Sequence, residues 1–132
     1  MKLLLDTNIC IYVIKKKPAT VLDQFRNFAP ADVCVSSITV FELMYGVYKS
    51  RRPMKNLEAL NLFLTPLAIL DFDKDDATVC GKVRAELEAK GQMIGPFDLQ
   101  IAAQALRRKL TLVSNNLREF GRVPHLETLS WQ

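Results

Sequence analysis

The chain begins with MKLLLDTNICIYVI, residues 1–14, and this stretch decides how the fold is interpreted. An apolar run of β-strand length, residues 2–6, ends at the carboxylate of Asp6, and Thr7 follows it. Asp and Thr are both suited to begin a helix, and the apolar spacing from here to Ile14 is helical. The stretch therefore predicts a buried strand that leads directly into a helix, with an acidic group at the junction.

The rest of the chain repeats this alternation of short apolar runs and amphipathic segments. We expect further strands at 33–35, 67–70 and 110–113 and one starting near Leu126, and helices at 19–28, through Glu42 to about Gly46, at 54–65, at 75–90 and from Asp98 to Leu106. Strands that alternate with helices indicate a parallel sheet covered on both faces. We predict an α/β fold in which a parallel sheet of four to five strands is flanked by helices on both faces, in a single domain over residues 1–132.

The composition is that of a globular protein. Of 132 residues, 49% are hydrophobic and 24% are charged, which suffices for a core without disulfides. Cys10, Cys34 and Cys80 are scattered in apolar contexts and have no metal-ligand spacing, so we interpret them as buried thiols of a reducing cytoplasm. No segment has the length of a signal sequence or a membrane span, and we therefore expect a soluble cytoplasmic protein.

The formal net charge is +4, and the basic residues gather at 15–17, 49–55 and 107–109. Basic surface around an acidic centre suits a polyanionic substrate such as nucleic acid. Lys and Arg at helix ends also offset the helix dipole, so each basic group has an equally good structural explanation. The charge pattern alone favours nucleic acid only modestly.

Three carboxylates lie where a purely structural acid is unfavourable. Asp6 ends the first strand, Glu42 interrupts the apolar stretch 38–44, and Asp98 opens an apolar helix. A carboxylate beside a core resists burial unless it is paired or binds a metal, so this pattern suggests a shared cation and metal-dependent phosphodiester chemistry. The alternative is that Asp6 and Asp98 only cap helices and that Glu42 pairs with a base, although no base lies three or four residues away.

Four segments together closely resemble the motifs of PIN-domain ribonucleases. They are Leu4-Leu5-Asp6-Thr7-Asn8, Ser36-Ser37-Ile38-Thr39-Val40-Phe41-Glu42-Leu43, Ile94-Gly95-Pro96-Phe97-Asp98-Leu99-Gln100-Ile101-Ala102 and Val113-Ser114-Asn115-Asn116-Leu117-Arg118-Glu119-Phe120. More narrowly, the chain is similar to the VapC toxins of bacterial VapBC toxin–antitoxin modules. The resemblance is greatest to the enterobacterial group that cuts initiator tRNA in its anticodon loop.

The resemblance implies catalytic roles for Asp6, Glu42, Asp98 and Asn116, with Mg²⁺ or Mn²⁺ held chiefly by Asp6 and Asp98. Such a cation polarises the phosphate and lowers the pKa of a bound water, so no histidine base is needed and His125 is interpreted as incidental. Asn116 departs from the family because that position is often Asp. It is equally suited to orient a water and to begin a helix or turn.

Neighbouring polar residues are expected to support the acids. Thr7, Asn8 and Ser114 are predicted to hydrogen-bond to the carboxylates, although the first two are also suited to cap a helix. Glu119 is exposed in this interpretation and is only a secondary candidate.

The resemblance also implies a VapB-type antitoxin as partner and a homodimer. We expect a groove for an amphipathic helix between the helices near 9–15, 19–28 and 54–65, lined by Ile9, Tyr12, Phe25, Phe28, Leu57, Leu60 and Phe63. The alternative is that these side chains pack together as core.

Two other functions are compatible with parts of this pattern. An aspartyl-phosphate phosphatase needs a second Asp two residues after the first, where this chain has Asn8. A catalytically silent PIN-domain module that binds RNA or protein remains the alternative, although it usually lacks the acidic set that is present here.

Overall fold

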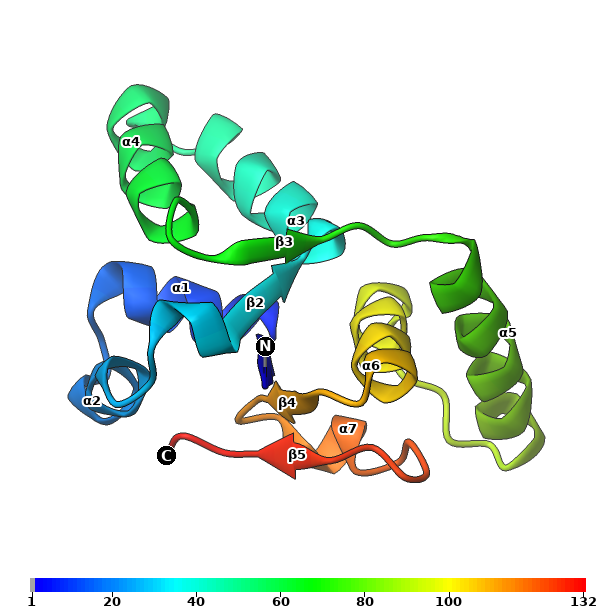
Figure 1. Cartoon of the computed structure of the whole chain (residues 1–132). Helices are drawn as coiled ribbons and strands as arrows, with labels where there is room; N and C mark the ends of the chain where they lie inside the picture. Colours follow the sequence, from blue (N-terminus) through cyan, green and yellow to red (C-terminus); the bar gives the residue numbers. More distant parts are fainter. Residues whose placement is uncertain (1) are drawn as a thin grey trace.

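The computed structural model describes residues 2–132, and its centre is a parallel sheet with the strand order β3-β2-β1-β4-β5 (Figure 1). The strands are β1 (Leu3–Leu5), β2 (Val33–Ser36), β3 (Ala68–Leu70), β4 (Thr111–Val113) and β5 (Thr128–Leu129). β1 lies in the middle, where Leu5 pairs with Val35 of β2 and with Val113 of β4. The predicted α/β fold with a five-stranded parallel sheet is confirmed.

Helices cover both faces of this sheet, as predicted. In the described residues they are α1 (Thr7–Lys15), α2 (Ala19–Arg26), α3 (Ser37–Tyr48), α4 (Pro53–Leu64), α5 (Lys74–Ala89), α6 (Pro96–Arg108) and α7 (Leu117–Phe120), with a 3₁₀ turn η1 (Pro30–Asp32). Leu3 and Leu5 face a core formed with α1, α2 and α4, whereas Leu4 faces a core formed with α5 and α6. Figure 1 shows α1 and α2 on the left of the sheet and α5 and α6 on the right.

Several expected boundaries differ by a few residues. The helix expected at 19–28 ends at Arg26, the one through Asp98 begins earlier at Pro96, and the last strand begins at Thr128 rather than at Leu126. Helix α3 likewise continues past Gly46 to Tyr48, because Val47 is buried one turn after Leu43. The expected stop of α5 is confirmed, since Gly91 follows it with a positive φ of 65°.

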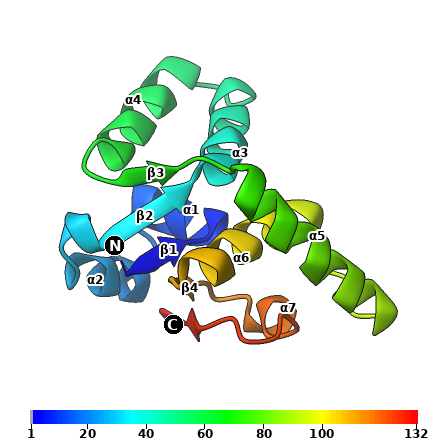
Figure 2. The ribbon, with the colours of Figure 1, turned by 45° about the vertical axis from the view of Figure 1, so that its right-hand side comes forward.

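A network of ion pairs joins α5 to α6 on the outside of the core that Leu4 faces. Both ribbon views show these two helices side by side (Figures 1 and 2). The Asp76 side chain is fully buried and accepts hydrogen bonds from Arg107 Nε at 2.6 Å and Arg108 Nη2 at 3.0 Å. Gln104 Nε2 donates to the same carboxylate, and Arg107 also pairs with Asp73. We call these five residues the arginine–aspartate cluster.

The two arginines hold the pKa of Asp76 well below its ordinary value, against the effect of burial. Asp73 and Asp76 also form a capping box at the start of α5, so the same acids begin one helix and bind the next. The arginine–aspartate cluster is therefore a paired, structural use of buried acid.

The cysteine prediction holds for Cys10 and Cys34, which are buried, while Cys80 is only half-buried. All three are free thiols, and burial raises the pKa of Cys34 to about 11. None of the helices within residues 2–132 combines the length and apolar character needed to cross a membrane.

Candidate active site

Asp6 occupies the junction between β1 and α1 at the carboxyl edge of the sheet. Its side chain is buried, and Oδ1 accepts a hydrogen bond of 2.8 Å from the backbone N–H of Ile9, which caps α1. Burial raises the pKa of Asp6, hydrogen bonds from Ser114 and Ile9 lower it, and the charge of Glu42 raises it. The capping role considered from sequence is therefore real, and it coexists with a place beside a second acid.

Glu42 reaches this site from the middle of α3. Thr7 Oγ1 donates a hydrogen bond of 2.7 Å to Glu42 Oε1, and Thr7 Oγ1 also lies 3.0 Å from the hydroxyl of Thr39. These contacts fix the carboxylate against the start of α1. Within residues 2–132 no Lys or Arg forms a salt bridge with Glu42, so the alternative of a simple ion pair is wrong.

Asp98 lies in the first turn of α6, three residues after the N-cap Gly95, so it is not the cap of its helix. Burial and the charges of Glu119, Asp6 and Glu42 together raise its pKa to about 6. The other three acids therefore crowd negative charge around Asp98.

Glu119 is more central than the sequence suggested. It is half-buried, and Oε1 accepts a hydrogen bond of 2.7 Å from the backbone N–H of Gly95 while Oε2 accepts one of 2.9 Å from Asn116 Nδ2. A Cβ added at Gly95 would lie 3.6 Å from Glu119 and 3.9 Å from Asp98, so this backbone runs beside both acids. The sequence feature that could have indicated this role is the spacing of Asn116 and Glu119, which lie three residues apart at the start of a helix.

Asn116 stands at the N-cap position of α7, but its side chain forms no capping hydrogen bond. Its amide instead donates to Glu119, and its backbone N–H donates to Ser114 Oγ at 2.9 Å. Of the expected supporting residues, Thr7 donates a hydrogen bond to Glu42, and Ser114 lowers the pKa of Asp6. Asn8 is exposed, and in the described part of the chain its side chain has no hydrogen bond to a carboxylate.

We call Asp6, Glu42, Asp98 and Glu119 the carboxylate cluster. None of them forms a salt bridge with Lys or Arg within residues 2–132, although the chain carries a net charge of +4. The neighbouring acids raise the pKa of Asp6 and Asp98, so the cluster has affinity for a cation, and carboxylate oxygens are ligands for hard divalent ions.

Over residues 2–132, no three His, Cys, Asp or Glu side chains lie close enough to hold one ion by themselves. Mg²⁺ usually binds to one or two carboxylates and completes its shell with waters and substrate phosphate. The donor set therefore fits such an ion.

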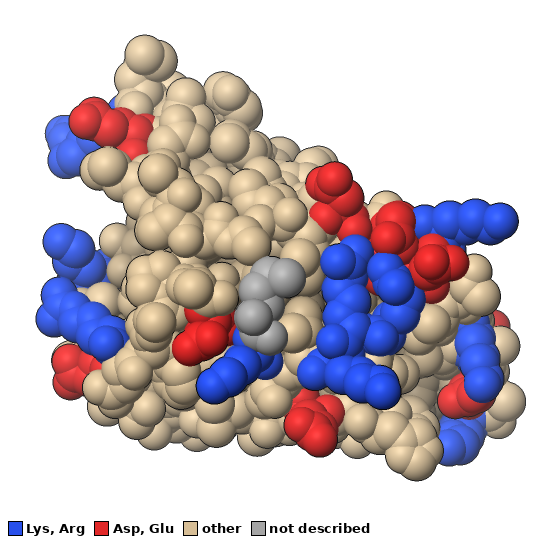
Figure 3. All heavy atoms as spheres, viewed as in Figure 1, with Lys and Arg blue, Asp and Glu red and all other residues tan. Residues whose placement is uncertain are grey.

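The basic groups expected to contact RNA are not equivalent. Residues 15–17 and 49, 51, 52 and 55 are exposed, but Arg107 and Arg108 are occupied in the arginine–aspartate cluster. In Figure 3 the Lys and Arg side chains on the right of the visible face, over α5 and α6, stand directly beside Asp and Glu. The interpretation of 107–109 as a free basic group is therefore wrong for both arginines and leaves only Lys109.

The parallel sheet and the acids at its carboxyl edge define a nuclease-like α/β protein. The family model of the PIN domain matches residues 3–126, and the chain belongs to this family. It is 47% identical over 131 residues to the tRNA(fMet)-specific endonuclease VapC of Shigella flexneri, covering 99% of this chain and 98% of the relative. It is 49% identical, with the same coverage, to ribonuclease VapC2 of Haemophilus influenzae.

A solved structure agrees with this assignment. The crystal structure of DNA-bound VapBC from Salmonella typhimurium contains a chain that is 44% identical to this one and superposes with a TM-score of 0.94, covering 100% of this chain and 99% of that chain. Ribonucleases with a PIN domain generally depend on a divalent metal ion.

Proposed function

We propose that this protein is the toxin of a toxin–antitoxin pair and acts as a Mg²⁺-dependent endoribonuclease that cleaves initiator tRNA in its anticodon loop, which stops translation. The observation that carries the proposal is the carboxylate cluster, in which Asp6, Glu42, Asp98 and Glu119 gather with no salt bridge to Lys or Arg among residues 2–132. The alternative of a silent binding module is disfavoured because such a module gains nothing from acids placed close enough together to raise the pKa of Asp6 and Asp98.

Asp6 and Asp98 are the proposed metal ligands, with Mn²⁺ as a substitute for Mg²⁺. A divalent ion bound there would polarise the scissile phosphate and lower the pKa of a bound water that attacks phosphorus. The α1 cap and Ser114 hold Asp6 in place, and Thr7 holds Glu42. Glu119, anchored by Gly95 and Asn116, keeps the negative charge around Asp98 high. Asn116 thus acts on the site through Glu119 as well as by orienting water.

The substrate assignment rests on the similarity to the tRNA(fMet)-specific endonuclease VapC of Shigella flexneri. An anticodon loop offers unstacked nucleotides on a structured RNA, which suits a site at the open edge of a sheet. The exposed basic residues at 15–17 and 49–55 supply phosphate contacts around that edge.

A VapB-type antitoxin is the proposed inhibitor, and its groove matches the one expected from the sequence only in part. Of the seven apolar residues expected to line a groove, Ile9 and Leu60 are buried and the other five pack against the same core. A groove of about 340 Å³ opens between α1, α3 and α4, and Leu60 lies in its wall together with Ile11, Ile14 and Val47.

Two charged residues at this groove suggest how inhibition works. Lys15 and Glu42 both line it, so a helix bound there reaches the carboxylate cluster directly. A basic side chain of the antitoxin would then neutralise the acids that bind the metal.

A homodimer is part of the same proposal. Phe41, Tyr45 and Tyr48 are 55%, 62% and 68% exposed, and their spacing places them along one side of α3. Burying this stripe in a second copy would join two basic surfaces around one structured RNA.

The test is cleavage of total tRNA by the purified protein, followed by sequencing of the new 5′ ends. We expect one dominant cut in the anticodon loop of initiator tRNA with Mg²⁺ or Mn²⁺ and none in excess chelator. Cleavage that persists in chelator would exclude the metal mechanism. Indiscriminate cutting of single-stranded RNA would exclude the tRNA assignment but leave the nuclease assignment intact.

A further inference from the structure

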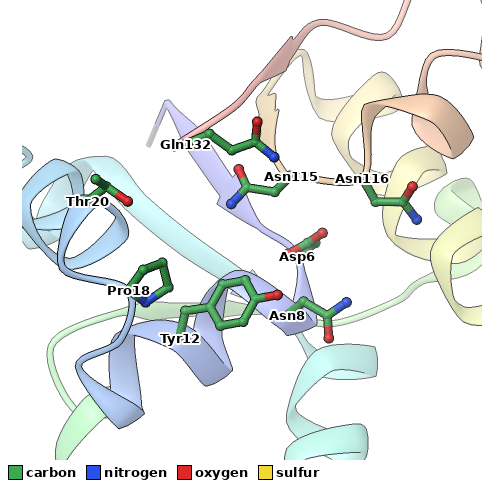
Figure 4. Close-up of a pocket in the computed structure, with 8 residues that line it drawn as sticks. All are labelled: Asp6, Asn8, Tyr12, Pro18, Thr20, Asn115, Asn116 and Gln132. Atoms are coloured by element: carbon green, nitrogen blue, oxygen red, sulfur yellow. The ribbon is translucent and has the colours of Figure 1, made fainter.

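A polar pocket opens directly beside Asp6, between the α1–α2 hairpin and the loop after β4 (Figure 4). Its volume of about 560 Å³ is in the range of pockets that bind small organic groups. Asp6 and Pro18 form part of its wall, and the remaining lining side chains carry amides or hydroxyls: Asn8, Tyr12, Thr20, Asn115, Asn116 and Gln132. We call this space the amide pocket.

The chemistry of the wall argues against a phosphate as the ligand. No Lys or Arg of the described residues lines the amide pocket, although Lys15, Lys16 and Lys17 are close in sequence to Pro18. Amide groups donate and accept hydrogen bonds at the same time, which matches the edges of nucleobases. Tyr12 adds an aromatic ring, on which a base can stack.

Hydrogen bonds within the protein hold the side chain of one wall residue, Asn115, in one orientation. Asn115 Oδ1 accepts hydrogen bonds from the backbone N–H of Trp131 at 2.9 Å and from Ser130 Oγ at 3.0 Å. The oxygen of this amide is therefore occupied, and its NH₂ remains to donate. Figure 4 shows the Asn115 nitrogen on the side of the pocket that faces Thr20. A donor held in one orientation selects among ligands by their acceptor pattern.

We propose that the amide pocket receives the base of a nucleotide that adjoins the scissile phosphate, and so makes cleavage depend on the identity of that nucleotide. The inference rests on the proposed ribonuclease function. Since Asp6 belongs to both the carboxylate cluster and the pocket wall, a phosphate held at the acids brings a neighbouring base to the amides. Such a base must be unstacked, which confines cleavage to loops and single strands.

The experiment uses synthetic copies of the mapped RNA substrate that differ at one nucleotide flanking the cut, carrying each of the four bases or no base. At one of the two flanks the wild-type kcat/KM should vary by at least about tenfold among the bases, as expected for a hydrogen-bonded base edge. The abasic RNA should be among the poorest substrates.

The variant for this test is Thr20→Val with Gln132→Ala, which removes hydrogen-bonding groups from the wall but none from the carboxylate cluster. In this variant, kcat/KM should differ by no more than about threefold among the four bases, and kcat/KM on the abasic RNA should be unchanged. Tyr12→Phe, which removes only a hydroxyl, is a milder second variant. Thr65→Val with Gln92→Ala makes the same chemical changes at exposed positions outside the pocket and should behave as wild type.

The outcomes separate the two proposals. Wild-type protein that cuts no RNA overturns the proposed function and this inference with it. Wild-type protein that cuts all bases and the abasic RNA equally overturns only the inference. So does a pocket variant that keeps the full base preference, including one that instead loses binding of the antitoxin, which would assign the pocket to a protein ligand.

Discussion

The carboxylate cluster and the arginine–aspartate cluster use buried acid in opposite ways. In the second, Arg107 and Arg108 neutralise Asp76 and hold its pKa well below the ordinary value. In the first, burial and neighbouring acids raise the pKa of Asp98 to about 6, and within residues 2–132 no Lys or Arg pairs with it. The charges of the arginine–aspartate cluster are therefore balanced within the folded chain, whereas the carboxylate cluster requires a cation from solution.

The largest expected effect is on cleavage by Asp98→Asn. The amide keeps the shape but removes a charge from the cation site, so RNA cleavage should fall by roughly three orders of magnitude or more. The thermal unfolding temperature should not fall, because the change also relieves repulsion. Asp23→Asn on exposed α2 is the matched control. A variant with wild-type cleavage would place the metal site elsewhere.

Asp76→Ala should show the reverse pattern. It leaves two partly buried arginines without their common partner, and the free energy of unfolding should fall by about 3 kcal/mol. Cleavage per folded molecule should stay near that of wild type. Denaturant unfolding measures the loss, and Asp75→Ala, at the exposed neighbouring position, should cost less than about 1 kcal/mol. Equal losses for the two variants would contradict the structural role of Asp76.

Glu119→Gln tests a residue that supports the carboxylate cluster. The neutral side chain still accepts from Gly95 but no longer contributes charge near Asp98, so cleavage should fall by about 10- to 100-fold. Steady-state kinetics at several Mg²⁺ concentrations should show a higher metal requirement. Glu58→Gln, a change at an exposed position on α4, is the control and should not alter cleavage. Wild-type cleavage by Glu119→Gln would show that Glu119 does not support the site.

The smallest expected effect is the change in the free energy of unfolding at low pH. Because the folded pKa of Asp76 lies below its unfolded value of about 3.9, its stabilisation is fully present above that value and is lost as pH falls below it, toward the folded pKa. Wild-type stability should therefore decline more steeply than that of Asp76→Ala below about pH 4. Parallel curves from unfolding titrations would show that the ion pairs contribute nothing.

The sequence predicted most of the carboxylate cluster but not the arginine–aspartate cluster. The alternation of apolar runs predicted the sheet, and the motifs predicted Asp6, Glu42, Asp98 and Asn116 as site residues, whose catalytic roles stay predictions. Glu119 was underrated because its contacts with Gly95 and Asn116 arise only when α6 and α7 meet in the fold.

The arginine–aspartate cluster could not be anticipated at all. Asp76 and Arg107 are 31 residues apart, and nothing in either segment marks them as partners. The basic residues 107–109 were consequently assigned to RNA. Of the apolar residues expected to line a groove, only Leu60 lies in the wall of the groove between α1, α3 and α4, because helical periodicity shows which side of a helix is buried and not what buries it.

Calorimetric titration of Mn²⁺ into the purified protein tests the central claim most directly, because it measures the cation site without RNA. Wild-type protein and Asp23→Asn should bind the ion with the same affinity, and Asp98→Asn should bind it at least about tenfold more weakly. Binding of Mn²⁺ to Asp98→Asn with wild-type affinity would contradict the account, because the unpaired carboxylates would then not be the cation site.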